Sequence, residues 1–227
     1  GSGMIAPDMA TMLTFIFTDA TIPAPVLQKL LVRATSRSFN SITVDSDTST
    51  SDTVLLCATG KGEPHRKVCS SSDRHLRDFR KKLEDLMQEL ARQIVRDGEG
   101  ASKFVTIQIS GGASEKAARR IGLAVANSPL VKTAIAGGDA NWGRVVMAVG
   151  KTGEKVDRDL LSISMGGIPI ARKGEIIKGY DEKPVAAHLK GSEIMLEIDV
   201  GVGRGCSTVW TCDLTHDYIT INADYRS

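Results

Sequence analysis

The stretch that decides the fold is GSGMIAPDMATMLTF, residues 1–15. It contains a bond between two small residues, Ala10 and Thr11, with a glycine-containing lead before it and the apolar, strand-like run 12–17 after it. A threonine that begins a buried strand can act as a nucleophile once the bond before it is cut, because the freed α-amine can accept the hydroxyl proton. The alternative is an ordinary β-branched residue that opens an ordinary strand. This stretch alone favours the ordinary strand, so the rest of the chain has to decide.

The composition indicates a globular protein without a nucleic-acid or membrane partner. Of the 227 residues, 41% are hydrophobic and 25% are charged, as in soluble globular chains. The net charge is +2, and no basic block stands apart from the acids as a nucleic-acid footprint would. The apolar runs are shorter than a membrane span, and the first residues lack the pattern of a secretory signal. We therefore expect a cytoplasmic protein.

Neither a metal site nor a nucleotide site is predicted. The four cysteines form no CxxC pair and are expected as free thiols, and the four histidines show no ligand spacing. The near-match to a phosphate-binding loop at 150–152 lacks its upstream glycine, and the calcium-like start at Asp45 lacks the glycine and the glutamate of such a loop.

Helices are predicted in the middle of the chain and strands at both ends. Apolar residues recur at helical spacing in 24–38, 73–95, 114–126, 128–136, 141–149 and, briefly, 185–189. Strand-like runs are 12–17, 41–44, 54–58, 104–109, 161–165, 168–171, 193–200, 207–213 and 218–223. Residues 201–205, rich in glycine, are a plausible hairpin connection. The arrangement favours an α+β layered fold over a doubly wound parallel sheet.

Several polar groups lie between the predicted elements and have two interpretations each. The run 45–52 offers hydroxyls and carboxylates that could orient a reacting group, although such runs more often close turns on their own backbone. Glu99, between two glycines, is either a substrate-binding carboxylate or base, or a solvated loop acid. Asn222 and Ser227 either face a pocket or belong to a frayed tail.

Six motifs occur in order and span almost the whole chain. They are GSGMIAPDMATML (1–13), DTSTSDT (47–53), DGEGA (97–101), NSPLVKTA (127–134), DANWGR (139–144) and YITINADY (218–225). In these motifs the sequence resembles the ornithine acetyltransferase family, the bifunctional glutamate N-acetyltransferases of the cyclic arginine pathway. Because six ordered motifs agree, the resemblance is far more specific than any one of them.

The resemblance implies a precursor that cuts itself. Members of the family are cleaved between Ala and Thr of the first motif into an α and a β chain that stay associated as α2β2 assemblies. The matching bond here is Ala10–Thr11, so residues 1–10 resemble the end of an α chain and residues 11–227 a β chain, one domain completed by the α chain. The fold implied is the layered α-β-β-α sandwich of this self-cleaving, N-terminal-nucleophile-like type.

The resemblance also implies the chemistry and the site. Thr11 would take the acetyl group of N-acetylornithine as an ester and pass it to glutamate, with its α-amine or a bound water moving the proton. Glu99, Asn222 and Ser227 would bind substrate, Ser227 standing where threonine is more usual. No cofactor is implied, and acetyl-CoA stays open as a co-substrate because some members accept it.

One departure limits what this chain is expected to do alone. The family's oxyanion-hole Thr-Gly pair and a substrate-binding lysine lie upstream of Gly1, and losing one oxyanion donor costs roughly a hundredfold to a thousandfold in rate. We therefore expect activity to require the α chain. Two alternatives remain: an N-terminal-nucleophile aminopeptidase or amidase, and an inactive β-chain fragment that serves only in assembly.

Overall fold

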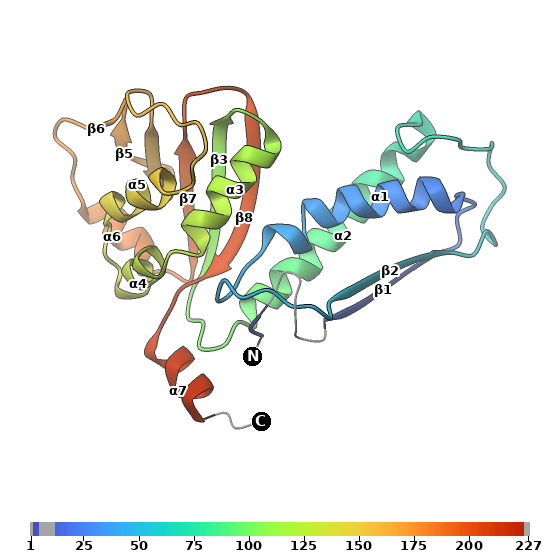
Figure 1. The fold of residues 1–227 in the computed structure, drawn as a ribbon, viewed down its shortest axis with the longest axis horizontal. Coiled ribbons are helices and arrows are strands. Elements are labelled where there is room, and N and C mark those ends of the chain that lie inside the picture. The colour runs from blue at the N-terminus through green and yellow to red at the C-terminus, as the bar shows by residue number, and fades with distance from the viewer. Residues whose placement is uncertain (1, 5–11, 225–227) are drawn as a thin grey trace.

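The computed structural model describes residues 2–4 and 12–224, which form two sheets with helices packed on them (Figure 1). The elements are β1 (Leu13–Thr18), α1 (Ala24–Ser36), η1 (Phe39–Ser41), β2 (Thr53–Ala58), η2 (Arg74–Leu76), α2 (Arg77–Arg96), β3 (Phe104–Gly112), α3 (Glu115–Ala126), α4 (Pro129–Gly137), α5 (Trp142–Gly150), β4 (Ser162–Met165), β5 (Ile168–Arg172), β6 (Glu175–Ile176), α6 (Lys183–Leu189), β7 (Glu193–Asp199), β8 (Gly205–Cys212) and α7 (His216–Asp224).

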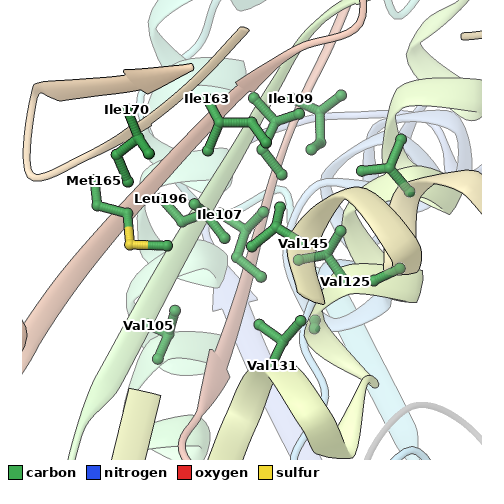
Figure 2. Close-up of a cluster of buried hydrophobic side chains, with 14 of the residues drawn as sticks. Val105, Ile107, Ile109, Val125, Val131, Val145, Ile163, Met165, Ile170 and Leu196 are labelled. Atoms are coloured by element: carbon green, nitrogen blue, oxygen red, sulfur yellow. The ribbon is translucent and has the colours of Figure 1, made fainter. Parts of the chain in front are cut away.

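The larger sheet has six strands in the order β6-β5-β4-β7-β3-β8. Strand β3 runs parallel to β7 and antiparallel to β8. Helices α3, α4 and α5 cover one face of this sheet, and the apolar side chains between sheet and helices form a core that includes Ile107 and Leu196 (Figure 2). The opposite face is polar and borders an open groove of about 1170 Å³, whose lining includes Gln108, Ser110, Ser162, Ser164, Glu197, Asp199 and Thr208.

The smaller sheet pairs β1 with β2 in parallel, Leu13 opposite Thr53. Helices α1 and α2 lie along it in Figure 1, and a second core of buried side chains, among them Ile16, Leu30 and Met87, joins these elements to the end of β8. The predicted α+β class is confirmed.

Local capping signals explain why the central helices begin where the sequence predicted. The side chains of Ser114, Ser128 and Asn141 accept hydrogen bonds from the backbone N–H groups of Ala117, Val131 and Arg144, respectively. Such bonds satisfy N–H groups that have no partner inside a helix. Helix α4 ends at Gly137, and the next residue, Gly138, has φ +70°, a left-handed cap that glycine adopts without steric cost.

The hairpin predicted at 201–205 is wrong. Strands β7 and β8 do not pair, because β3 lies between them. The backbone N–H groups of Val202 and Gly203 donate to the carbonyl of Gly111, at 2.8 and 2.7 Å, so this connection crosses the end of β3. Strand order depends on contacts far apart in sequence, which the local pattern of a strand does not contain. The short strand predicted at 41–44 is also wrong, since this segment forms only an isolated bridge between Ile42 and Trp210.

The strand predicted at 218–223 is also wrong, since this segment is part of helix α7. The Asp213 carboxylate accepts the Lys103 N–H at 2.9 Å, which ties the chain beyond β8 to the start of β3. The Thr215 hydroxyl then accepts the Asp217 N–H at 3.2 Å and supplies the capping bond at the start of the helix. The alternating isoleucines of this segment stay exposed rather than entering a sheet.

Core packing makes a first prediction. Ile107, in the middle of β3, is fully buried, and Ile107→Ala should lower the free energy of unfolding by about 2–5 kcal/mol because it leaves a cavity in a close-packed interior. The adjacent Gln108 is exposed on the opposite face, so Gln108→Ala should change it by less than about 0.5 kcal/mol. Urea unfolding followed by circular dichroism measures both, and equal losses would contradict the assignment of the two faces.

Candidate functional site

Two residues predicted to bind substrate, Glu99 and Asn222, meet in the structure. The Asn222 amide nitrogen Nδ2 donates to Glu99 Oε2 at 2.8 Å, although the residues are 123 positions apart in sequence. The same amide donates to the carbonyl of Tyr218 at 3.0 Å, one turn earlier in α7. Glu99 is half-buried and Asn222 exposed, so the pair lies where a small molecule can reach it.

The loop that carries Glu99 follows directly from the end of α2 and is held against the start of α7. Thr215 Oγ1 donates to the Gly100 carbonyl at 2.7 Å. Gly100 has φ +66°, and a Cβ built there would lie 2.4 Å from the Tyr218 backbone nitrogen, so only glycine permits this approach. The glycine after Glu99 in the DGEGA motif therefore lets the two backbones touch.

Residues 2–4 pack against the loop that carries Glu99. Ser2 forms a parallel bridge with Gly98, the Glu99 N–H donates to the Ser2 carbonyl at 2.8 Å, and the Ser2 N–H donates to the Asp97 carbonyl at 2.5 Å. A Cβ built on Gly3 would lie 2.8 Å from Glu99 Oε2. Gly3 therefore lies directly against the carboxylate of Glu99, the candidate substrate-binding group.

The run 45–52 contributes one carboxylate at each end. Asp45 Oδ2 accepts the Met4 N–H at 2.9 Å, and Asp52 Oδ1 accepts the Met12 N–H at 3.2 Å. The two aspartates therefore hold the residues on either side of 5–11, the stretch that contains the Ala10–Thr11 bond. The run also closes turns on its own backbone, because Asp45 Oδ1 accepts the Asp47 N–H and Ser49 Oγ accepts the Ser51 N–H.

Burial and neighbouring charges shift the pKa values of three groups near the loop that carries Glu99. Burial, followed by the nearby Asp45 and Glu99 carboxylates, raises the pKa of Tyr218 to about 12, so its hydroxyl keeps its proton at neutral pH. Beneath the loop, Lys132 of α4 is buried and donates to Thr211 Oγ1 at 2.9 Å and to the Cys212 carbonyl. Burial lowers the pKa of Lys132 and raises that of the Cys212 thiol.

Three predicted residues, Ala10, Thr11 and Ser227, lie outside the described part of the chain. Of the predicted site the structure therefore brings together Glu99 and Asn222. Next to them lie Asp45, which belongs to the candidate run 45–52, and Tyr218, which the sequence did not single out as a site residue. Tyr218 had one signal, its place four residues before Asn222 in a shared motif. That signal has meaning only once the segment is known to be a helix.

The candidate site is a cluster of half-buried and exposed side chains, separate from the groove on the polar face of the six-stranded sheet. None of Asp45, Glu99, Tyr218 or Asn222 lines that groove. No helix within residues 12–224 is long and apolar enough to cross a membrane.

Comparisons with known proteins agree with the motifs. The model of the ArgJ family matches residues 1–227. The curated "Arginine biosynthesis bifunctional protein ArgJ" of Zymomonas mobilis is 58% identical over 228 residues, covering 100% of this chain and 55% of the relative, and that of Ruegeria pomeroyi is 59% identical over 227 residues, covering 100% and 54%. The chain thus spans about half the length of these curated relatives.

A solved structure agrees as well. The crystal structure of the arginine biosynthesis bifunctional protein argJ from Bacillus halodurans superposes with a TM-score of 0.88 at 39% identity, covering 95% of this chain and 100% of the solved one. The match supports the layered α+β sandwich drawn from the motifs. Sequence, fold and motif order lead to the same result, and the chain belongs to the ArgJ family.

Proposed function

We propose that this chain, assembled with the rest of the family protein, transfers an acetyl group from N-acetylornithine to glutamate. The observation that carries the proposal is the meeting of Glu99 and Asn222, at 2.8 Å, beside residues 2–4. A carboxylate and an amide next to one another suit an amino-acid substrate, because the Glu99 carboxylate and the amide oxygen of Asn222 can both accept from its ammonium group. The names of the curated relatives place them in arginine biosynthesis.

The proposed reaction passes through an ester on Thr11. The Thr11 hydroxyl attacks the acetyl carbonyl, the amide C–N bond breaks, and ornithine leaves with the proton that the Thr11 α-amine or a water has moved. The α-amine of glutamate then attacks the ester, which gives N-acetylglutamate and restores the hydroxyl. The exchange needs no cofactor, because both steps are acyl transfers. Acetyl-CoA is a second candidate donor for the first step.

The free α-amine requires cleavage of Ala10–Thr11, which is part of the proposal. The remaining half of the relatives' length is the candidate α chain, with α2β2 as the proposed assembly.

Detection of the acetyl ester on Thr11 tests the proposed reaction directly. The assembled enzyme incubated with N-acetylornithine without glutamate should show one acetyl group on the peptide that begins at Thr11, and added glutamate should remove it. A parallel incubation with acetyl-CoA tests the second donor. Hydrolysis of small peptide amides with no acetylated Thr11 and no need for glutamate would favour the amidase alternative instead.

The charge of Glu99 makes a second prediction. Glu99→Gln keeps an oxygen that can accept from Asn222 but removes the negative charge, so kcat/KM for N-acetylornithine should fall about 10- to 100-fold, the worth of a hydrogen bond to a charged group. Steady-state kinetics measure it. Glu175→Gln makes the same change on the exposed strand β6 and should leave kcat/KM within about twofold. Equal effects of the two changes would refute the role of Glu99.

A further inference from the structure

The Asp45 carboxylate is the point where three separate parts of the chain meet. Its Oδ2 accepts the Met4 N–H at 2.9 Å and the Tyr218 hydroxyl at 3.3 Å, and its Oδ1 accepts the Asp47 N–H at 3.2 Å. A carboxylate offers about four acceptor positions, so these three bonds can exist together. One side chain thus joins the segment before the Ala10–Thr11 bond, the turn at 45–47 and the C-terminal helix α7.

Asp45 and Glu99 approach the same residue. A Cβ built on Gly3 would lie 3.1 Å from Asp45 Oδ2 and 2.8 Å from Glu99 Oε2. Each carboxylate has acceptor positions that neighbouring donors can fill. The donors present are Met4 N–H and Tyr218 O–H on Asp45, and Asn222 Nδ2 on Glu99.

Helix α7 depends on these polar bonds for its position. None of its nine residues is buried, so no apolar face fixes it to the core, and a helix of this length is marginal by itself in water. The described contacts that join it and its cap to the rest of the chain include Thr215 to Gly100, Asn222 to Glu99 and Tyr218 to Asp45. The first anchors its start and the second is the site itself, so Tyr218 is the anchor between them.

The hydroxyl of Tyr218 is suited to this task. Its raised pKa of about 12 keeps it protonated over the working range of a cytoplasmic enzyme, so it acts as a donor to Asp45 at all relevant pH values. A donor bound to a charged acceptor forms a stronger bond than a neutral pair. The ring is half-buried, whereas the neighbouring Ile219 is 62% exposed.

We infer that Asp45 and Tyr218 are positioning residues of the acetyl-transfer site: their bond fixes the turn of α7 from which Asn222 reaches Glu99, and Asp45 holds this turn in register with residues 2–4. The inference rests on the proposed function for its kinetic consequence but not for its structural one. Neither residue touches the reacting atoms in this scheme. They act through Asn222 and Glu99.

Tyr218→Phe tests the inference because it removes one oxygen and keeps the ring. In the assembled enzyme we expect KM for N-acetylornithine to rise about tenfold, the equivalent of about 1.4 kcal/mol, with kcat within about threefold. Amide hydrogen exchange of peptides covering 216–224 should become faster. Thr220→Ala removes a hydroxyl from the same helix whose bond goes to its own His216 carbonyl, and should change neither measurement.

A double-mutant cycle shows whether Asp45 and Tyr218 act on KM through their shared hydrogen bond or independently of each other. If the two side chains act through one bond, Asp45→Ala with Tyr218→Phe should raise KM no more than Asp45→Ala alone. Asp45→Ala should also speed exchange in the peptide covering residues 2–4, which Tyr218→Phe should leave unchanged. Both expectations follow from the three hydrogen bonds that the Asp45 carboxylate accepts.

The outcomes distinguish this inference from the proposed function. Wild-type exchange over 216–224 in Tyr218→Phe overturns the positioning role, whatever the kinetics. Additive increases in KM in the double variant overturn it as well. Faster exchange in Tyr218→Phe, in a protein that forms no acetylated Thr11, would uphold the positioning of α7 and refute only the acetyl transfer.

Discussion

Thr11→Ala is expected to abolish acetyl transfer and to leave the chain uncut at the preceding bond. Both losses would have one cause, because the hydroxyl proposed to attack the acetyl carbonyl is also the group that can attack the carbonyl of Ala10. Removing a catalytic nucleophile lowers kcat by a factor on the order of 10⁴ or more. Gel electrophoresis of the full-length protein shows cleavage, and the release of ornithine from N-acetylornithine measures transfer.

Thr14→Ala is the matched control. Thr14 is the next threonine along the chain, on β1, and its hydroxyl bonds to Met12 Sδ at 2.9 Å rather than to any residue of the candidate site. This variant should be cut and active. To separate the two roles of Thr11, the α part ending at Ala10 and the β part beginning at residue 11 can be produced as two polypeptides. Acetyl transfer by such an assembly carrying alanine at position 11 would eliminate Thr11 as nucleophile.

Local signals account for what could be predicted of the fold. Helices α3 and α4 begin where Ser114 and Ser128 cap them, because a cap and the apolar spacing that follows are written within about ten residues. The order of the six strands is not local, since β3 enters between β7 and β8 from about 90 residues upstream. Alternation along β7 predicts which of its side chains face the core but not which strand lies beside it.

The candidate site, like the fold, could be predicted only in part from the sequence. Glu99 and Asn222 could be assigned because each lies in a motif shared with a family, not because the sequence shows that they meet. The bond between Asp45 and Tyr218 joins residues 173 positions apart, and the predicted strand at 218–223 concealed the helical spacing of Tyr218 and Asn222. Short segments with β-branched residues favour either structure, and contacts outside the segment decide between them.

The outer face of the β1–β2 sheet carries the second large expected effect. The exposed fractions of Leu13, Phe15, Phe17 and Leu55 are 54%, 55%, 70% and 46%, and all four side chains are apolar. Among the described strands, β1 and β2 pair only with each other. Parallel sheets are ordinarily covered on both faces, and an apolar patch of this kind marks an interaction surface.

We propose that the other half of the family protein covers this surface. The curated relatives are nearly twice as long as this chain, so each carries a further segment of similar length. Strand β1 begins at Leu13, two residues after Thr11 in the sequence, so a partner seated on the start of β1 would lie close to the proposed nucleophile. Docking of the α chain would then complete the site as well as cover the apolar face.

Phe17→Asp should therefore weaken association of the two chains by about 100-fold or more. The change gives up the burial of an aromatic side chain, about 1.5–3 kcal/mol, and would place an unpaired charge in the interface. Separately tagged α and β chains allow the dissociation constant to be measured directly. Ile176→Asp makes a similar change at a residue that is 50% exposed on β6, at the far edge of the other sheet, and should leave association intact. Undiminished association of Phe17→Asp would show that the α chain covers some other face, and equal losses in both variants would point to a general effect of added charge.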